Sequence, residues 1–330
     1  MHMDVFRGDA FTLMPLSGVV NTMPYAPTQL RKKGWFQSEG VNTLDISIEL
    51  TNDKLTLVPT APRGAPGVNK GLQRRSMKTF RSVHMPQEVT LFADEVNGLR
   101  AVGSETEEEV AMNRLKKKMA VAKRDNDITL EYQLMGALRG QVLDADGTTV
   151  LWDYNAEFGT TKPTRNVALS NNGTKVLQEV VSIERQVEDA LGGLTFTGLT
   201  VLCSPEWMDA FTGHPLVKES YVYQMSSKLR ENYRKGFEFG GHWFEEYRGT
   251  VNGQRFLPAG KALVVPEGVP DMFKTYYSPA PYMETVGTDG LEWYAKQKNM
   301  DYDIGVTVQM QTNPLHLVER PGALLELSVT

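Results

Sequence analysis

Cysteine is almost absent from this chain: Cys203 is the single one in 330 residues. One cysteine cannot form a disulfide within the chain, which indicates a reducing compartment or a fold that needs no covalent cross-links. Long hydrophobic runs are absent too. No apolar stretch approaches the ~20 residues that cross a bilayer, and Pro15 and Gly18 interrupt the apolar residues at 11–20, where a signal peptide needs a continuous segment. We therefore expect a soluble protein made inside the cell, with no membrane partner.

The sequence also lacks the usual motifs of catalytic and metal sites. It contains no Gly-Lys-Ser/Thr phosphate loop, no Gly-x-Gly-x-x-Gly run and no Gly-x-Ser-x-Gly turn. The five histidines lie far apart, without the paired spacing of metal ligands. Cys203 belongs to an apolar run, which is typical of a buried, unreactive cysteine. We therefore expect no enzyme, no catalytic residue, no cofactor and no metal.

Acidic residues are absent from residues 54–87, although the whole chain carries a formal net charge of −5. This segment contains seven basic residues: Lys54, Arg63, Lys70, Arg74, Arg75, Lys78 and Arg81. Proline and glycine crowd its middle at 59–67, so that part can neither continue a helix nor lie in the centre of a sheet. An alternating run at 44–50 precedes it and an extended run at 78–90 ends it, which predicts a projecting two-stranded arm. Because an isolated hairpin is marginally stable in water, we expect the arm to lie on an acidic surface of another copy of the chain.

Length and composition limit the class of protein. A chain of 330 residues suggests about two compact units. A hydrophobic content of 41% is enough to form cores, which excludes global disorder. The net acidic charge argues against a dedicated nucleic-acid binder, whose surface is normally strongly basic. The basic segment is therefore a local feature.

A long charged helix is the clearest element in the pattern. A capping box at 104–107 predicts its start, and its apolar stripe consists of Met112, Leu115, Met119 and Ala122. The sequence Asp-Asn-Asp at 125–127 predicts an interruption, after which Asp127 caps a second helix. The lysine run at 116–118 indicates a face that contacts solvent or another subunit. In contrast, residues 1–44 are expected to form an arm without helices, because three prolines interrupt them.

The remaining pattern alternates strands and helices. Asp146-Gly147 and Asn252-Gly253 each predict a hairpin with a type I′ turn. Residues 174–191 form an amphipathic pattern that ends at a glycine pair, and a strand at 199–203 leads into a helix capped by Ser204. Later strands are expected at 261–265, 304–308 and 323–329. These elements predict the α+β class with two mixed units.

The order of these parts resembles that of a known family. The segments that carry the resemblance are 41–49, 57–67, 252–266 and the closing segment at 313–326, Asn-Pro-Leu-His-Leu-Val-Glu-Arg-Pro-Gly-Ala-Leu-Leu-Glu. They are similar to the lambda-type family, major capsid protein E, of tailed bacteriophages. The resemblance implies the tailed-phage major capsid fold. That fold would have an N-terminal arm at 1–44, an extended hairpin loop at 45–90, a peripheral domain at 91–156 and 280–330, and an axial domain at 157–279.

The same resemblance implies assembly rather than catalysis. Copies of the chain would form pentamers and hexamers of an icosahedral head shell, assembled in the host cytoplasm and found in the virion. The other implied partners are a scaffolding protein, a portal, a decoration protein in some members, and packaged DNA bound without sequence specificity. The seven basic residues of the extended loop would lie at a subunit interface. Two alternatives stay open at this point: a tail-tube type of virion protein, and a nucleic-acid-binding module that uses the basic arm at 54–87.

Overall fold

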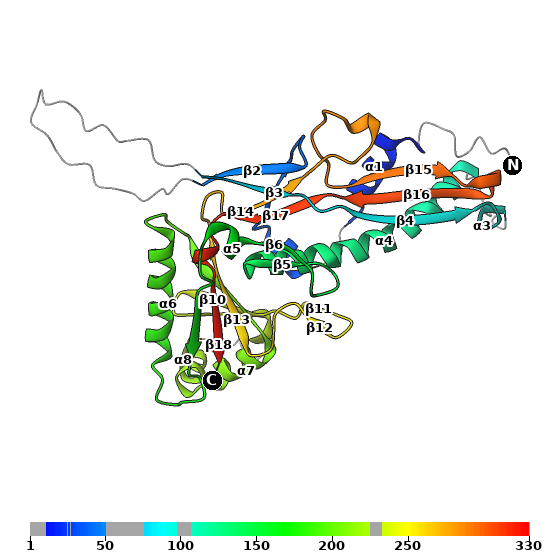
Figure 1. Ribbon diagram of the computed structural model, residues 1–330. Helices are drawn as coiled ribbons and strands as arrows, with labels where there is room; N and C mark the ends of the chain where they lie inside the picture. The colour runs from blue at the N-terminus through cyan, green and yellow to red at the C-terminus, as the bar shows by residue number, and fades with distance from the viewer. Residues whose placement is uncertain are drawn as a thin grey trace, which may run out of the picture. The chain divides into compact units, whose positions relative to one another are not determined.

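The computed structural model describes residues 11–24, 26, 28–50, 76–97, 107–224 and 233–329 (Figure 1). The chain forms two compact units. Unit 1 comprises Met1–Ile46, Arg81–Glu131 and Lys274–Leu317, and unit 2 comprises Ser47–Phe80, Tyr132–Phe273 and Val318–Thr330. Both units mix helices with sheets, which confirms the expected α+β class. None of the helices in the described part of the chain is long and apolar enough to cross a membrane.

An antiparallel three-stranded sheet is the centre of unit 1. Its strand order is β15 (Tyr294–Asn299), β16 (Gly305–Thr312) and β4 (Met85–Phe92). Helix α1 (Leu13–Thr22) contacts β15, and the stripe of α4 (Glu107–Leu138) shares a core with the sheet. That core includes Phe11, Leu16, Val20, Val89, Leu91, Leu115, Met119, Leu130, Trp293, Val306 and Val308.

Smaller elements complete unit 1. A second sheet has the order β1 (Gln37–Gly40), β14 (Phe273–Tyr277) and β17 (Pro314–Val318), with β1 parallel to β14. Two short helices, α2 (Gln29–Lys33) and α3 (Ala93–Asn97), flank the longer ones in sequence. Two single 3-10 turns, η4 (Met283–Thr285) and η5 (Asp301–Asp303), precede and follow β15.

A mixed six-stranded sheet is the centre of unit 2. Its order is β7 (Thr164–Val167), β18 (Leu325–Val329), β13 (Lys261–Glu267), β8 (Gly198–Cys203), β10 (His242–Glu246) and β9 (Phe237–Phe239). Helices α6 (Val176–Leu191) and α7 (Pro205–Gly213) supply apolar side chains to its core. There Phe211 stacks on Phe244 with 4.5 Å between ring centroids. The helices α5 (Tyr154–Phe158) and α8 (Pro215–Gln224) and the 3-10 turns η3 (Tyr233–Lys235) and η6 (Pro321–Ala323) also belong to this unit.

Two hairpins of unit 2 test the predicted turns. The strands β11 (Thr250–Val251) and β12 (Gln254–Arg255) pair around Asn252 and Gly253, whose φ angles of 49° and 82° fit the predicted type I′ turn. The strands β5 (Gln141–Leu143) and β6 (Val150–Asp153) also pair, but only Gly147 has a positive φ. The predicted type I′ turn there is wrong, because the Asp146 carboxylate instead accepts hydrogen bonds from the amides of Thr148 and Thr149.

The N-terminal segment is not an arm without helices. Residues 13–22 form α1, and Leu16 and Val20 are fully buried in the core of unit 1. Pro15 is the third helical residue, and the first four amides of a helix have no partner within the helix. Its missing N–H therefore costs no hydrogen bond: the first bond of α1 runs from Leu16 N to Thr12 O at 3.1 Å.

The predicted break at 125–127 is also wrong, because α4 continues without interruption from Glu107 to Leu138. Asp and Asn are only moderately unfavourable inside a helix, and Asp127 is buried among polar partners that favour this position. The predicted capping box at 104–107 begins outside the described residues. The stripe of Leu115 and Met119 packs on the sheet of unit 1, as described above.

Only the base of the expected two-stranded arm belongs to the described residues. Strand β2 (Asp45–Leu50) pairs with β3 (Ser76–Arg81), and residues 51–75 lie outside the described residues. The extended run predicted at 78–90 is divided between β3 and β4. The division into peripheral and axial domains stays a prediction about the assembled shell. The compact units place residues 132–156 and 318–330 together with 157–273.

Candidate assembly elements

The two-stranded ribbon of β2 and β3 is held by aromatic packing at its base. The Phe80 ring lies 5.6 Å from the Tyr154 ring and 5.7 Å from the Phe158 ring. Ser47 and Thr79, which lie on opposite strands, share a hydrogen bond between their hydroxyls at 3.1 Å. The ribbon therefore has a fixed starting point in unit 2 from which the chain continues to residues 51–75.

Only two of the seven predicted interface residues belong to the described chain. Lys78 lies 3.5 Å from Glu157, and Arg81 lies 3.9 Å from Asp45. Exposed pairs of this kind contribute about 0–1 kcal/mol to stability, so these contacts are weak enough to be exchanged for contacts with another molecule. The other five residues, Lys54, Arg63, Lys70, Arg74 and Arg75, lie outside the described residues.

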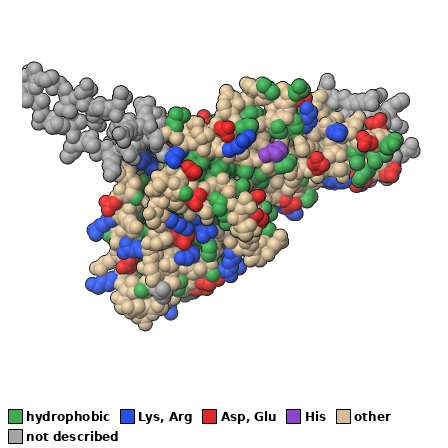
Figure 2. Space-filling view, in the orientation of Figure 1, with side chains coloured by type: hydrophobic (Ala, Val, Ile, Leu, Met, Phe, Trp, Pro, Cys, Tyr) green, Lys and Arg blue, Asp and Glu red, His purple; other side chains and the backbone are tan. Residues whose placement is uncertain are grey.

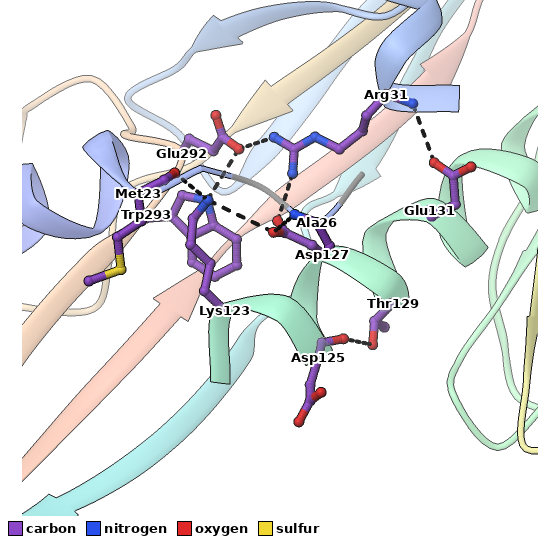
Figure 3. Close-up of polar contacts among 10 residues, drawn as sticks. All are labelled: Met23, Ala26, Arg31, Lys123, Asp125, Asp127, Thr129, Glu131, Glu292 and Trp293. Carbon is purple, nitrogen blue, oxygen red and sulfur yellow. Dashed lines mark hydrogen bonds and ion pairs between the residues drawn. The ribbon is translucent and has the colours of Figure 1, made fainter. Parts of the chain in front are cut away.

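A set of charges, buried at Lys123, Asp127 and Glu131, fastens the N-terminal segment to α4 in unit 1; we call it the N-terminal clamp (Figure 3). It consists of Arg31, Lys123, Asp127, Glu131 and Glu292. The Arg31 guanidinium donates to Asp127 Oδ1 at 2.8 Å and also to Glu292. Lys123 donates to the carbonyl of Met23 at 3.1 Å.

Backbone amides complete the N-terminal clamp. Asp127 Oδ2 accepts from the amide of Ala26 at 2.9 Å. Glu131 accepts from the amides of Leu30 and Arg31, at 2.8 and 3.3 Å, at the start of α2. A carboxylate at a helix N-terminus satisfies amides that have no partner within the helix. The side chains of α4 therefore fix both the position and the start of α2.

Burial shifts the ionisation of the clamp. Desolvation raises the pKa of Asp127, although the Ala26 amide, Lys123 and Arg31 favour its charged form. Desolvation lowers the pKa of Lys123, and the nearby Asp127 opposes this shift. Removing one member of a buried charged set leaves its partners uncompensated, which typically costs about 3–5 kcal/mol. The clamp thus holds the segment firmly only while it is complete.

The sequence carries only one signal of this clamp. Lys123, Asp127 and Glu131 follow one another at intervals of four, which places them on one face of a helix. Read locally, the central aspartate predicts a helix cap instead. The partners Arg31 and Glu292 lie far away in the sequence, and no local pattern indicates them.

A second charged set surrounds Glu326 on β18, the second strand of the sheet in unit 2. Glu326 of β18 lies 3.5 Å from both Arg139 and Lys261 and also pairs with Lys162. Burial opposes ionisation of this carboxylate, but Lys162, Arg139 and Lys261 outweigh it and lower the pKa of Glu326. The set links the C-terminal strand to the residues before β7, after α4 and at the start of β13.

Reactive groups are not assembled in the described residues. Cys203 is fully buried, and desolvation raises the pKa of its thiol well above the ordinary value, so the reactive thiolate is disfavoured. No group of three or more His, Cys, Asp or Glu side chains in the described ranges could hold a metal ion.

Comparison with known proteins identifies the family. The family model described as phage major capsid protein E matches residues 12–329. The major capsid protein of Pseudomonas phage KPP10 is 32% identical over 76% of this chain and 78% of its own length. The major capsid protein of Salmonella phage Felix O1 is 25% identical, with 96% of each chain covered.

Solved structures share the fold. The chain matches the capsid structure of cyanophage P-SCSP1u with a TM-score of 0.54 and 8% identity, over 94% of this chain and 90% of that one. It matches a phage-related protein of Bordetella bronchiseptica RB50 with a TM-score of 0.56 and 10% identity, over 97% and 98% of the two chains. These likenesses place the chain in the capsid fold of tailed phages, as expected.

Proposed function

The chain belongs to the phage major capsid protein E family, and we propose that its copies assemble as pentamers and hexamers into the icosahedral head shell that encloses phage DNA. The match of the family model across residues 12–329 carries this proposal. The function is that of a major capsid protein, a structural component of the virion. The alternatives, a tail-tube type of protein and a nucleic-acid-binding module, are not supported by these relatives.

We propose that the extended loop at 45–90 reaches a neighbouring subunit, with its seven basic residues at the interface. Support comes from the ribbon of β2 and β3, which is anchored by Phe80 and leads into the segment rich in basic residues. The weak pairs of Lys78 and Arg81 agree with side chains that exchange partners on assembly. The loop then binds through charge, and its contacts weaken as salt rises.

In the shell, residues 91–156 and 280–330 form the peripheral domain, and residues 157–279 form the axial domain. Unit 1 contains most of the long helix and the sheet of β15, β16 and β4, and unit 2 contains the six-stranded sheet. This division supports the proposed map in its main parts. Residues 1–44 serve as the N-terminal arm, which the clamp fastens to α4.

The proposed mechanism is assembly without catalysis. Each subunit contact can be weak, because many contacts that close one shell act together. A scaffolding protein directs assembly in the host cytoplasm, and the shell joins a portal and, in some relatives, a decoration protein. DNA is packaged without sequence specificity. The net charge of −5 suits this role, because a strongly basic wall would bind the phosphates of the incoming DNA.

Light scattering of the purified chain at micromolar concentration, with and without its scaffolding protein, tests the proposal. We expect particles of the size of pentamers, hexamers or shells. A monodisperse monomer under both conditions contradicts the proposed function.

A further inference from the structure

Strand β4 forms one edge of the sheet in unit 1, because β16 is its only partner strand among the described residues. In an antiparallel pair, successive residues point their amides and carbonyls alternately toward the partner strand and away from it. Directly after β4, the Ala93 amide donates to the Ile304 carbonyl at 2.9 Å, and before β4 the Val83 amide donates to the carbonyl at position 314 at 3.0 Å. Both bonds continue the register of β4 with β16. Odd-numbered residues of β4 therefore face β16, and the even-numbered residues face the open edge: Pro86, Glu88, Thr90 and Phe92.

The open edge of β4 offers few free groups to another strand. An edge strand can accept a further strand because its outward amides and carbonyls have no partner. Pro86 has no amide hydrogen to donate. The Lys118 ammonium, which comes from α4, donates to the Thr90 carbonyl at 2.7 Å. Among the described residues, Glu88 keeps both its amide and its carbonyl open.

A carboxylate completes the contacts at this edge. Glu95 lies in α3, the short helix that Figure 1 shows at the end of β4, and its Oε2 accepts from the Phe92 amide at 3.1 Å. The same carboxylate accepts from Lys118 at 2.7 Å. The hydrogen bond from Lys118, followed by that from the Phe92 amide, lowers the pKa of Glu95 below its ordinary value, so the carboxylate is charged at neutral pH. We call Lys118 and Glu95 together the edge cap.

Ion pairs by themselves are ordinary on this protein, because basic and acidic side chains are intermixed over the face of the molecule shown in Figure 2. Glu284 and Lys296, for example, form a pair of the same 2.7 Å length between η4 and β15. That strand is contacted by helix α1. The edge cap differs because its two side chains also bind the backbone of an edge strand, at Thr90 and Phe92.

We propose that the edge cap prevents a second copy of this chain from adding a strand to β4. A strand that paired with this edge would need the Thr90 carbonyl and the Phe92 amide, and the cap occupies both. Two copies of one edge can pair with each other about a twofold axis. If they paired around Glu88, two like charges would lie opposite each other, which is unfavourable. The inference goes beyond the proposed function, because it concerns the folded subunit before it joins any assembly.

Opening the edge tests the proposal. Dissociated subunits are kept at micromolar concentration without a scaffolding protein, and circular dichroism verifies that they are folded. Lys118→Met with Glu95→Ala should form irregular aggregates about tenfold faster than the parent in sedimentation, because the edge then accepts strands. Lys296→Met with Glu284→Ala removes an ion pair of equal length and should aggregate at the rate of the parent. Adding Glu88→Pro to the edge-opened variant should restore the rate of the parent, because a proline removes the open amide.

Aggregation of the edge-opened variant at the rate of the parent overturns the inference. Fast aggregation that Glu88→Pro does not slow, or that the control variant shares, overturns it as well. Shell formation is not measured in this experiment, so failure of the proposed function gives a separate result.

A second measurement needs no variant. In dissociated subunits of the parent, the amide hydrogens of Glu88 and Thr90 should exchange with deuterated water about tenfold or more faster than those of Val89 and Leu91. The reason is that the amides of Val89 and Leu91 face β16, whereas the other two face the open edge. Equal exchange rates overturn the inference, because β4 would then have no open edge to protect.

Discussion

Arg31 and Asp127 are separated by 96 positions in the sequence, yet the guanidinium of one donates to the carboxylate of the other at 2.8 Å. The Asp127 side chain is completely buried, in the middle of α4. This contact joins the N-terminal segment to the long helix inside unit 1. In a protein that assembles, it makes the N-terminal segment part of the folded subunit.

The first prediction concerns this contact. Asp127→Asn removes the charge that compensates Arg31 and Lys123, and we expect the free energy of unfolding to fall by about 3–5 kcal/mol. Denaturant unfolding followed by circular dichroism measures it. Asp125→Asn is the matched control, because Asp125 is exposed two residues away and should change stability by no more than about 0.5 kcal/mol. Equal stability of the two variants would show that the clamp does not hold the segment.

The second prediction concerns the stripe of α4. Leu115 is fully buried in the core of unit 1. Leu115→Asp therefore places an unpaired carboxylate in this core. The cost is on the order of the 3–5 kcal/mol that breaking a buried ion pair costs. We expect this variant to lose the cooperative thermal transition of unit 1. Lys117→Glu changes an exposed position of the same helix and should keep the parent transition. If Leu115→Asp melts like the parent, the assignment of this face to the core is wrong.

The third prediction concerns pH. Burial, with a smaller contribution from Arg31, lowers the pKa of His316 from 6.5 to about 3. The folded state therefore disfavours the protonated form. The contribution of neutral His316 to the stability of the fold is complete above pH 6.5 and is lost as pH falls toward 3. Between pH 7 and pH 5 the loss should be about 2 kcal/mol. His316→Gln removes this pH dependence. The free energy of unfolding of the parent minus that of the variant should therefore fall by about 2 kcal/mol between pH 7 and pH 5. A difference that stays constant between pH 7 and pH 5 rules out a buried neutral histidine.

The fourth prediction concerns the basic segment. Replacing Arg74, Arg75, Lys78 and Arg81 with serine should leave both units folded, because the ion pairs of Lys78 and Arg81 lie at the surface and pairs of this kind contribute about 0–1 kcal/mol. Shell formation should nevertheless fail or become sensitive to salt, since the loss recurs at every subunit. Sedimentation at low and high ionic strength measures this effect. Normal assembly of the variant at every salt concentration would mean that the loop does not bind through charge.

Local chemistry could be predicted from the sequence where a few adjacent residues determine the conformation. Asn252-Gly253 has the positive φ angles that its turn requires, and Ser204 caps α7 by accepting from the Trp207 amide at 3.3 Å. Gly192 ends α6 in the left-handed conformation. In each case the preference is a property of the residue and its nearest neighbours.

Where the prediction from the sequence was wrong, the conformation depends on tertiary contacts. Pro15 indicated an interrupted segment, yet it occupies a place in α1 where no amide is needed. Asp127 indicated a helix cap, and its partners Arg31 and Glu292 come from distant segments. The predicted interface residues of the basic segment stay a prediction, because five of the seven lie outside the described residues. Charge composition indicates that they need an acidic partner but not which one.

Electron microscopy of negatively stained particles tests directly whether the chain builds a capsid shell. The chain is produced together with its scaffolding protein, and the sedimenting fraction is imaged. We expect closed, uniform icosahedral shells or rings of five and six subunits. Monomers, or oligomers that are neither closed shells nor rings of five and six subunits, from a chain that is folded by circular dichroism, would contradict it.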